Sequence, residues 1–411
     1  MLFSFLIASV SAGPTSTAPI NRCINGAVDH EFLVTLKNSN TSDGRRLDTT
    51  EDKLSFLQGW VDQYTGDQLD SEGTYSNGTA RRKLEANSTH VSNCTHILHF
   101  FTETQFAVDV RACDEAIARM AEDPAVDSIE CDCLEHVDMS LPATPDLDEA
   151  VARRLTVHNG PPWGLDRIDG VDDNSYDDGD LTGGGTGVRV YVVDTGIQGS
   201  HQDFGGRVVS GHTAVAHPEC ASCQAVNGIL PADGTGCGDH GTHVASTVGG
   251  LDYGVAKNVT LVPAFSCFKF RCSDGTYRCG RTSDIRANLE WVLTDCAAHP
   301  EARCVVQRSL SGGFLTEDAA LLSTNVLVVA AAGNSATDWC SSYYDPITTP
   351  DKLLVGSTTQ WGALSSFSNY GACVNVQAPG SSIRAAFVGS SNTATATMSG
   401  TSMAAPHVSG V

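Results

Sequence analysis

The sequence predicts an α/β fold for the longer C-terminal part of the chain, a parallel sheet flanked by helices in three layers, with a small α+β module before it. Short apolar runs recur at 188–193, 259–264, 326–331 and 352–356, separated by helical patterns, which is typical of strands in a parallel sheet. The first run is followed directly by Asp194. In such sheets active-site residues collect at the carboxyl ends of strands, so this residue is the first candidate for chemistry.

The N-terminus reads as a secretory signal peptide covering residues 1–12. An apolar run at 2–10 is followed by small residues at both recognition positions before a cut after Ala12. A buried N-terminal strand is the alternative. No other apolar run approaches the roughly 20 residues that span a bilayer, so the mature protein is expected to be soluble and to have no membrane partner.

The composition also indicates that the protein is exported to an oxidising compartment. The chain has 15 cysteines, a number more typical of proteins in oxidising compartments, where cysteines form disulfides, than of proteins in the reducing cytosol. Its net charge of −23 is wrong for binding nucleic acid or an anionic membrane surface and fits a secreted, extracellular protein, with a lytic vacuole as the alternative location. Glycosylation sequons occur at Asn40, Asn77, Asn87, Asn93 and Asn258.

The module between the signal peptide and residue 154 alternates strand and helix patterns. The expected elements are a strand at 30–36, a helix at 54–61, an exposed loop at 66–91, a strand at 96–101, a helix at 110–121 and a strand at 126–130. The order of these elements and the run 123–130 resemble the inhibitory propeptide of subtilisin-like proteases, a small ferredoxin-like module with the order β-α-β-β-α-β. A free-standing binding module is the alternative.

A linker-like segment at 134–154 separates the two parts and ends on Arg153-Arg154. The run 161–168, Pro-Pro-Trp-Gly-Leu-Asp-Arg-Ile, resembles the opening of mature proteinase K-type enzymes. That resemblance implies a propeptide with its linker at 13–154 and a peptidase domain at 155–411. Our hypothesis is that the enzyme cuts itself there; a separate convertase that recognises the dibasic pair is the alternative.

Three residues form a candidate catalytic triad. A serine hydroxyl becomes a useful nucleophile when a histidine takes its proton and a carboxylate orients that histidine. Ser402 lies in the run 400–407, Gly-Thr-Ser-Met-Ala-Ala-Pro-His, which resembles the subtilase nucleophile signature almost residue for residue. His240 lies in Asp-His-Gly-Thr-His, and Asp194 follows its strand. The chain order Asp, His, Ser is that of the subtilisin-like layout.

The same resemblance implies an oxyanion donor and two substrate segments. Asn334, in Ala-Ala-Gly-Asn, is expected to donate its side-chain amide to the oxyanion together with the backbone amide of Ser402. The family binds a peptide as an added strand between two segments. The candidate substrate-binding residues are Leu310, Ser311, Gly312, Gly280, Ala332 and Gly333. The last two would line a pocket with room for a large apolar side chain.

No cofactor is expected to be required. His243 follows His240 at helical spacing, but without the intervening Glu of a zinc protease motif a structural role is favoured over zinc binding. Asn375 stands where proteinase K-like enzymes carry a calcium-binding Asp, and loss of a carboxylate weakens a site for a hard cation. The expected partners are protein or peptide substrates and the chain's own propeptide, and the protein is expected to be a monomer.

The resemblance to aqualysin-like enzymes also implies cysteine pairs. It predicts a Cys340–Cys373 disulfide and a bond from Cys237 to one of Cys267, Cys272 or Cys279. Cys220 and Cys223 are expected to form a disulfide that closes an inserted loop. The alternative is that they form a Cys-x-x-Cys redox or zinc site.

Three departures from the family pattern bear on activity. Ser311 separates Leu310 from the glycines of the family's Ser-Leu-Gly-Gly, and the segment 313–334 is several residues short. The chain also stops at Val411, inside the helix expected from Ser402, so the sequence looks truncated. The expected function is a secreted serine endopeptidase made as a self-inhibited zymogen. The alternative is a truncated or inactive pseudoprotease that acts by binding or inhibition.

Overall fold

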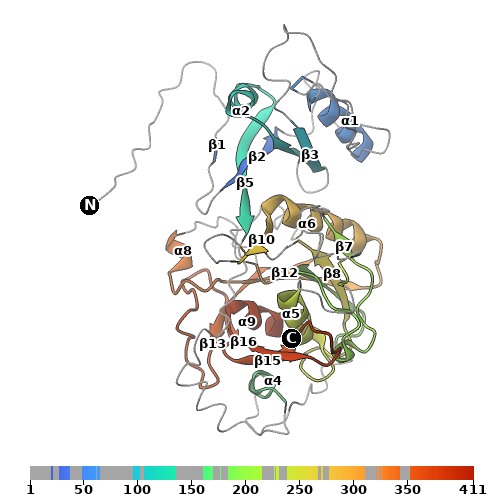
Figure 1. The fold of residues 1–411 in the computed structure, drawn as a ribbon, viewed down its shortest axis with the longest axis vertical. Helices are drawn as coiled ribbons and strands as arrows, with labels where there is room; N and C mark the ends of the chain where they lie inside the picture. The colour runs from blue at the N-terminus through green and yellow to red at the C-terminus, as the bar shows by residue number, and fades with distance from the viewer. Residues whose placement is uncertain are drawn as a thin grey trace, which may run out of the picture. The chain divides into compact units, whose positions relative to one another are not determined.

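The computed structural model describes residues 20–21, 27–37, 49–61, 63–64, 96–101, 106–135, 161–169, 176, 184–214, 226, 228–230, 238–266, 270–271, 277–310, 321, 324, 326–342 and 352–411. The chain forms two compact units, Met1–Cys133 and Leu134–Val411 (Figure 1). The predicted signal peptide, the dibasic pair and the cleavage site near residue 155 lie outside the described residues.

Apart from the two-residue β1, the first unit has the β-α-β-β-α-β order that the family resemblance implies, although β4 was not among the strands expected from the residues themselves. Its elements are β1 (Ile20–Asn21), β2 (Ala27–Leu36), α1 (Thr50–Val61), β3 (His96–Phe101), β4 (Ala107–Arg111), α2 (Asp114–Ala121) and β5 (Val126–Glu135), whose last two residues belong to the second unit. Strands β3, β4, β2 and β5 lie side by side in that order, each antiparallel to its neighbour, and the short β1 pairs with β5. Strands β3 and β4 form a hairpin, whereas β2 lies between two strands that are distant from it in sequence, β4 and β5.

Apolar faces of both helices pack on this sheet. Leu57 and Trp60 of α1 and Ile117 and Met120 of α2 share one buried cluster with strand residues such as Val108. The helix expected at 110–121 begins only at Asp114, because Val110 and Arg111 pair with Phe32 and Glu31 in the sheet. Pairing of β4 in the sheet therefore prevents these residues from joining the helix, although their apolar spacing is also compatible with one.

The second unit is built on a seven-stranded parallel sheet, which confirms the predicted α/β class. Its strands lie in the order β14 (Val376–Pro379), β13 (Lys352–Thr358), β12 (Leu327–Ala331), β11 (Arg303–Arg308), β6 (Val188–Asp194), β8 (Thr260–Phe265) and β7 (His212–Thr213). The four predicted apolar runs became β6, β8, β12 and β13. The central strand β11 was not expected, because Arg303, Gln307 and Arg308 interrupt its apolar pattern.

Alternate residues of β6 face opposite helical layers. Val190 and Val192 pack with Val244 and Val248 of α5 (Asp239–Gly249). Tyr191 and Val193 pack instead with α6 (Thr282–Ala297). Helix α9 (Thr401–Gly410) covers β12, β13 and β14 and contacts α5, so these two helices share one face (Figure 1). The result is three layers, helices, sheet and helices.

Shorter elements complete the second unit. They are α4 (Trp163–Ile168), the single turn η1 (Gln202–Phe204), β9 (Phe270–Arg271), β10 (Tyr277–Arg281), α8 (Trp339–Ser342) and the antiparallel pair β15 (Ile383–Ala386) and β16 (Thr395–Met398). Among the described residues, no helix combines the length and apolar character needed to cross a membrane.

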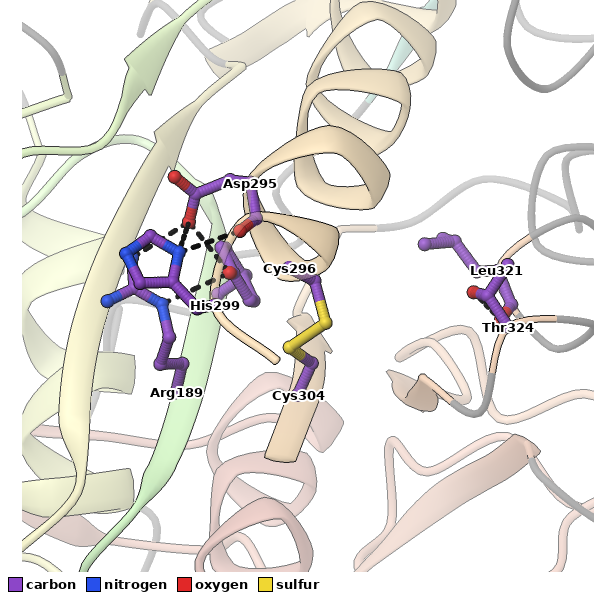
Figure 2. The surroundings of a disulfide bond; sticks show 8 residues. Arg189, Asp295, Cys296, His299, Cys304, Leu321 and Thr324 are labelled. Atoms are coloured by element: carbon purple, nitrogen blue, oxygen red, sulfur yellow. Dashed lines mark hydrogen bonds and ion pairs between the residues drawn. A yellow bond between two sulfur atoms is a disulfide. The ribbon is translucent and has the colours of Figure 1, made fainter. Parts of the chain in front are cut away.

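Two disulfides are present in the described part of the second unit. One joins Cys340 to Cys373, the pair implied by the family resemblance. The other joins Cys296, near the end of α6, to Cys304 of β11 and was not anticipated. Figure 2 shows it beside Asp295, whose carboxylate lies 2.8 Å from the guanidinium of Arg189. This end of the sheet is thus held by a covalent link and an ion pair; Cys220, Cys223, Cys237, Cys267 and Cys272 lie outside the described residues.

Candidate active site

Asp194 is the last residue of β6, at the carboxyl edge of the sheet. Its carboxylate is fully buried. Oδ1 accepts a hydrogen bond from the backbone amide of Thr195 at 2.7 Å, and both oxygens bind the imidazole of His240 at 2.8 and 2.9 Å. A buried carboxylate held in this way fixes the ring it contacts and stabilises positive charge on that ring.

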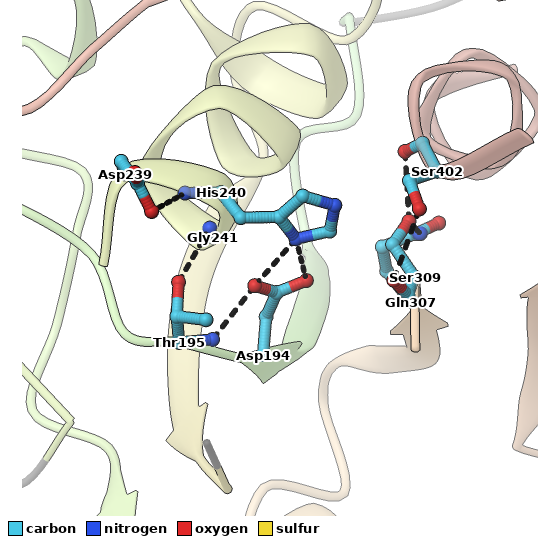
Figure 3. Close-up of polar contacts among 8 residues, drawn as sticks. All are labelled: Asp194, Thr195, Asp239, His240, Gly241, Gln307, Ser309 and Ser402. Atoms are coloured by element: carbon cyan, nitrogen blue, oxygen red, sulfur yellow. Dashed lines mark hydrogen bonds and ion pairs between the residues drawn. The ribbon is translucent and has the colours of Figure 1, made fainter. Parts of the chain in front are cut away.

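His240 is the second residue of α5 and is 1% exposed. Because Nδ1 carries the proton that binds Asp194, Nε2 is left as the basic nitrogen of the neutral ring. Within the described part of the chain Nε2 has no hydrogen-bond partner. Figure 3 shows the ring directed from α5 toward the start of α9, where Ser402 lies.

The start of α5 is held close to the end of β6. The amide of Gly241 donates to the hydroxyl of Thr195 at 2.8 Å. A Cβ on Gly241 would overlap the carbonyl oxygen of Gly196 and lie 3.0 Å from Oδ1 of Asp194. A glycine is therefore required for the helix to approach the carboxylate closely enough to present His240 to it.

Ser402 is the second residue of α9 and is 4% exposed. Its hydroxyl donates to the backbone carbonyl of Ser309 at 3.1 Å. Proton transfer to His240 therefore requires the hydroxyl to turn away from this carbonyl. Hydrogen bonds of a catalytic pair commonly tighten only in the substrate complex.

Asn334 follows β12 and is bound to the start of α9. Its Oδ1 accepts the backbone amide of Thr401 at 2.7 Å and the Thr401 hydroxyl at 2.9 Å. The amide nitrogen is consequently at the other end of the group. A Cβ placed on Gly400 would lie 3.3 Å from Nδ2 of Asn334 and 3.6 Å from the backbone nitrogen of Ser402. Two nitrogen atoms that carry N–H groups therefore lie close to the space beside Gly400.

Asn369 supports this loop and was not singled out from the sequence. Its Nδ2 donates to the carbonyl of Ala332 at 2.8 Å, and its Oδ1 accepts the amides of Ser335 and Thr337 at 3.0 and 3.2 Å. These contacts grip the chain on both sides of Asn334. Residues 332 and 369 are 37 positions apart, so no local pattern signals the contact.

The predicted substrate-binding residues are only partly described. Leu310 is 2% exposed and packs in the core cluster with Ile285 and Leu289, so only its backbone is available to a peptide. Ala332 and Gly333 are buried beside Asn334. Gly280 lies on β10, and Ser311 and Gly312 lie outside the described residues.

Within the second unit, Leu134 and Glu135, the last residues of β5, pair antiparallel with Arg281 and Cys279 of β10. An extended segment therefore already adds to the strand on which Gly280 lies. Strand addition of this kind is a common way to bind an extended peptide through its backbone.

Two further histidines near the site are structural. His243, on α5, is fully buried and its Nε2 lies 3.1 Å from the carbonyl oxygen of Ile383. Burial and the neighbouring His240 lower the pKa of His243 to about 3. His407, on α9, bonds the carbonyl of Met403 through Nδ1 at 2.8 Å, and burial lowers its pKa to about 4.

Asn375, at the position where proteinase K-like enzymes carry a calcium-binding Asp, is poorly suited to bind a cation. Oδ1 of Asn375 accepts the backbone amide of Leu354 at 2.7 Å, so this oxygen already has a partner within the sheet. A neutral amide is also a weaker ligand for a hard cation than a carboxylate. Among the described residues, no group of three or more His, Cys, Asp or Glu side chains is placed to hold a metal ion.

Of the five predicted glycosylation sites, one lies in the described part of the chain. Asn258 is exposed in the turn before β8. Asn40, Asn77, Asn87 and Asn93 lie outside it.

The chain is similar in sequence to known serine proteinases. The match to "Alkaline serine exoprotease A" of Vibrio alginolyticus is 40% identical over 304 residues and covers 72% of this chain and 49% of that protein. The match to "Extracellular serine proteinase" of Thermus sp. (strain Rt41A) is 39% identical over 317 residues, covering 75% and 66%. The chain thus spans about half to two thirds of the length of these curated relatives.

Among solved structures, a cold adapted subtilisin-like serine proteinase is 38% identical, with a TM-score of 0.47 and coverage of 61% of this chain and 83% of that one. A sequence model of the subtilase family, Peptidase_S8, matches residues 185–411, more than half of the chain. The matched range includes the residues that meet at the carboxyl edge of the sheet. The chain belongs to the subtilase family.

Proposed function

We propose that this protein is a secreted serine endopeptidase in which Asp194, His240 and Ser402 form the catalytic triad. The observation that carries the proposal is the buried His240 imidazole, bound through Nδ1 to both oxygens of Asp194 while Nε2 is directed toward the first turn of α9. Family membership and relatives named as serine proteinases support the same activity.

The proposed reaction begins when Ser402 Oγ attacks the carbonyl carbon of the scissile peptide bond. His240 Nε2 takes the hydroxyl proton, and Asp194 stabilises the imidazolium that forms. The carbonyl oxygen becomes negative and is bound by the backbone amide of Ser402 and Nδ2 of Asn334. As the C–N bond breaks, His240 returns the proton to the leaving amine. Water, deprotonated by His240, then hydrolyses the acyl-enzyme and releases the acid product.

Substrate is proposed to bind as an extended strand. Gly280 on β10 and the segment Leu310, Ser311 and Gly312 would supply backbone hydrogen bonds on either side of the peptide. The small residues Ala332 and Gly333 leave room for a large apolar side chain next to the cut bond. The pairing of Leu134 and Glu135 with β10 supports this role for β10.

The same pairing supports synthesis as a self-inhibited zymogen. Leu134 and Glu135 lie at the start of the predicted linker, 134–154, and occupy the edge of β10 that a substrate would use. The start of the linker would therefore compete with substrate for this edge of β10 until the chain is cut near residue 155. N-terminal sequencing of the full chain carrying Ser402→Ala shows whether the enzyme itself or a separate convertase makes this cut. An unprocessed variant indicates self-cleavage, and a processed one indicates a separate convertase.

Activity is tested by labelling the full chain with a fluorophosphonate probe, which phosphonylates an activated serine. Labelling that Ser402→Ala abolishes and Asp194→Asn strongly slows supports the proposed triad. A folded chain that takes no label, with no hydrolysis of denatured protein, would instead favour the inactive pseudoprotease. Secretion is tested separately, by finding the chain in the medium with N-glycans at the predicted sequons.

A further inference from the structure

The carbonyl of Ser402 lacks its normal helical donor. In an α-helix each carbonyl accepts the N–H of the residue four positions later. For Ser402 that residue is Pro406, which lies inside α9 and has no N–H. Ser402 is 4% exposed, so water has little access to the orphaned oxygen. A buried carbonyl without a donor destabilises its position, and here that position belongs to the candidate nucleophile.

Ser309 supplies the missing donor. This residue directly follows β11 and is 1% exposed. Its hydroxyl donates to the carbonyl of Ser402 at 2.8 Å, and the Ser402 hydroxyl donates to the carbonyl of Ser309 at 3.1 Å. The two serines are thus joined by reciprocal hydrogen bonds between side chain and backbone (Figure 3).

Gln307 holds the Ser309 hydroxyl in this orientation. Its side chain is fully buried on β11, and Nε2 donates to Ser309 Oγ at 2.7 Å. The hydroxyl therefore receives one hydrogen bond and directs its own proton to Ser402. Oε1 of Gln307 accepts the hydroxyl of Ser409. Ser402 and Ser409 lie two turns apart on one face of α9. Gln307 and Ser309 together therefore contact the helix at two points along its axis.

We propose that Gln307 and Ser309 are positioning residues for the nucleophile, which set the rotation and depth of α9 and hence the location of Ser402 Oγ relative to His240. The inference rests on the proposed role of Ser402. Neither residue needs to touch substrate. Their effect should appear in the chemical step, because loss of the Ser309 hydroxyl frees the helix to shift until its orphaned carbonyl finds another donor.

The test compares wild type, Ser309→Ala and the matched control Ser365→Ala, all as the full chain. Ser365 is also buried, and its hydroxyl bonds only Ser357 and Ser381, outside β11 and α9. Rates are measured per folded molecule, as the fluorophosphonate labelling rate and as kcat and KM for a peptide ester. Ser309→Ala should lower kcat about tenfold or more with KM within about twofold, since a shift near 1 Å can cost up to about 10²-fold. Ser365→Ala should lower Tm but leave kcat within about twofold.

A second substitution distinguishes positioning from general damage. Pro406→Ala, placed in the Ser309→Ala background, returns an N–H four residues after Ser402. It should recover kcat at least about threefold in that background. Gln307→Met keeps the shape of the side chain but donates no hydrogen bond, and it should lower kcat in the same direction as Ser309→Ala.

The outcomes separate the two proposals. Wild type that is not labelled contradicts the triad, and the positioning role is overturned with it. Labelled wild type with unchanged kcat in Ser309→Ala overturns the positioning role alone. If Ser309→Ala does not fold, unchanged kcat in Gln307→Met overturns it in the same way. If Pro406→Ala recovers none of the kcat lost in Ser309→Ala, the positioning role is also contradicted. The missing hydrogen bond to the Ser402 carbonyl would then not be the cause of the loss.

Discussion

Thr401 donates both its backbone amide and its hydroxyl to the side-chain oxygen of Asn334, at 2.7 and 2.9 Å. The Thr401 hydroxyl oxygen in turn accepts the amide of Gly333 at 3.0 Å. The residue before the candidate nucleophile therefore decides which end of the Asn334 amide faces the space beside Gly400. It couples the oxyanion donor on the β12 loop to the helix that carries Ser402.

Thr401→Val should weaken this coupling without changing the shape of the side chain. The amide of Asn334 would lose one of two bonds that hold its oxygen, so Nδ2 would face the oxyanion for less of the time. We expect kcat to fall about tenfold with little change in KM, less than the roughly 10²–10³-fold cost of removing an oxyanion donor outright. Thr393→Val is the control, because that exposed hydroxyl bonds only Ser391. Equal kcat in the two variants would contradict the coupling.

Asp194→Asn should act on the tautomer of His240. An amide group can present N–H to Nδ1, which moves the ring proton to Nε2 and removes the base that Ser402 needs. The expected loss of kcat at neutral pH is about 10⁴-fold, by analogy with this substitution in other triads. Circular dichroism and a folded melting curve check that the protein is intact. A variant with more than a tenth of wild-type kcat would rule out this role for the carboxylate.

Gly400→Ala should fill the oxyanion space with a methyl group. The backbone at Gly400 is extended, a conformation that alanine adopts without strain, so the effect should be local. The added Cβ would lie 3.3 Å from Nδ2 of Asn334 and 3.6 Å from the amide of Ser402. We expect kcat/KM to drop about 10²-fold with a small change in Tm. Normal turnover in Gly400→Ala would place the oxyanion elsewhere.

Stability should fall in acid partly through buried histidines. Burial lowers the pKa of His407 from 6.5 to about 4, so the unfolded chain binds a proton before the folded chain does. Its contribution is constant above about pH 6.5 and is lost as pH falls from there toward 4, at about 1.4 kcal/mol per pH unit. The measurement is urea unfolding of Ser402→Ala with and without His407→Gln. His407→Gln should flatten the pH dependence of the unfolding free energy between pH 6 and 4.5; parallel curves would contradict this.

Much of the second unit was predictable because its strands are buried on both faces. Such strands appear as continuous apolar runs, and the runs at 188–193 and 259–264 became β6 and β8 within a residue or so. Strand β11 escaped prediction for the opposite reason. Its buried Gln307 and Arg308 are residue types usually found at the surface, and the hydrogen-bond partners of Gln307, Ser309 in the following loop and Ser409 of α9, are distant or irregular in pattern.

The sequence by itself singled out the candidate residues Asp194, His240, Ser402 and Asn334 and most of the strands and helices on which they lie. Those signals are local, since they depend on side-chain type and on spacing within one element. The tertiary structure alone decided that Asn369 grips the loop around Asn334 and that Ser309 fills the hydrogen bond denied by Pro406. Residues 309 and 402 are 93 positions apart, so their contact exists only once the sheet and α9 have packed together.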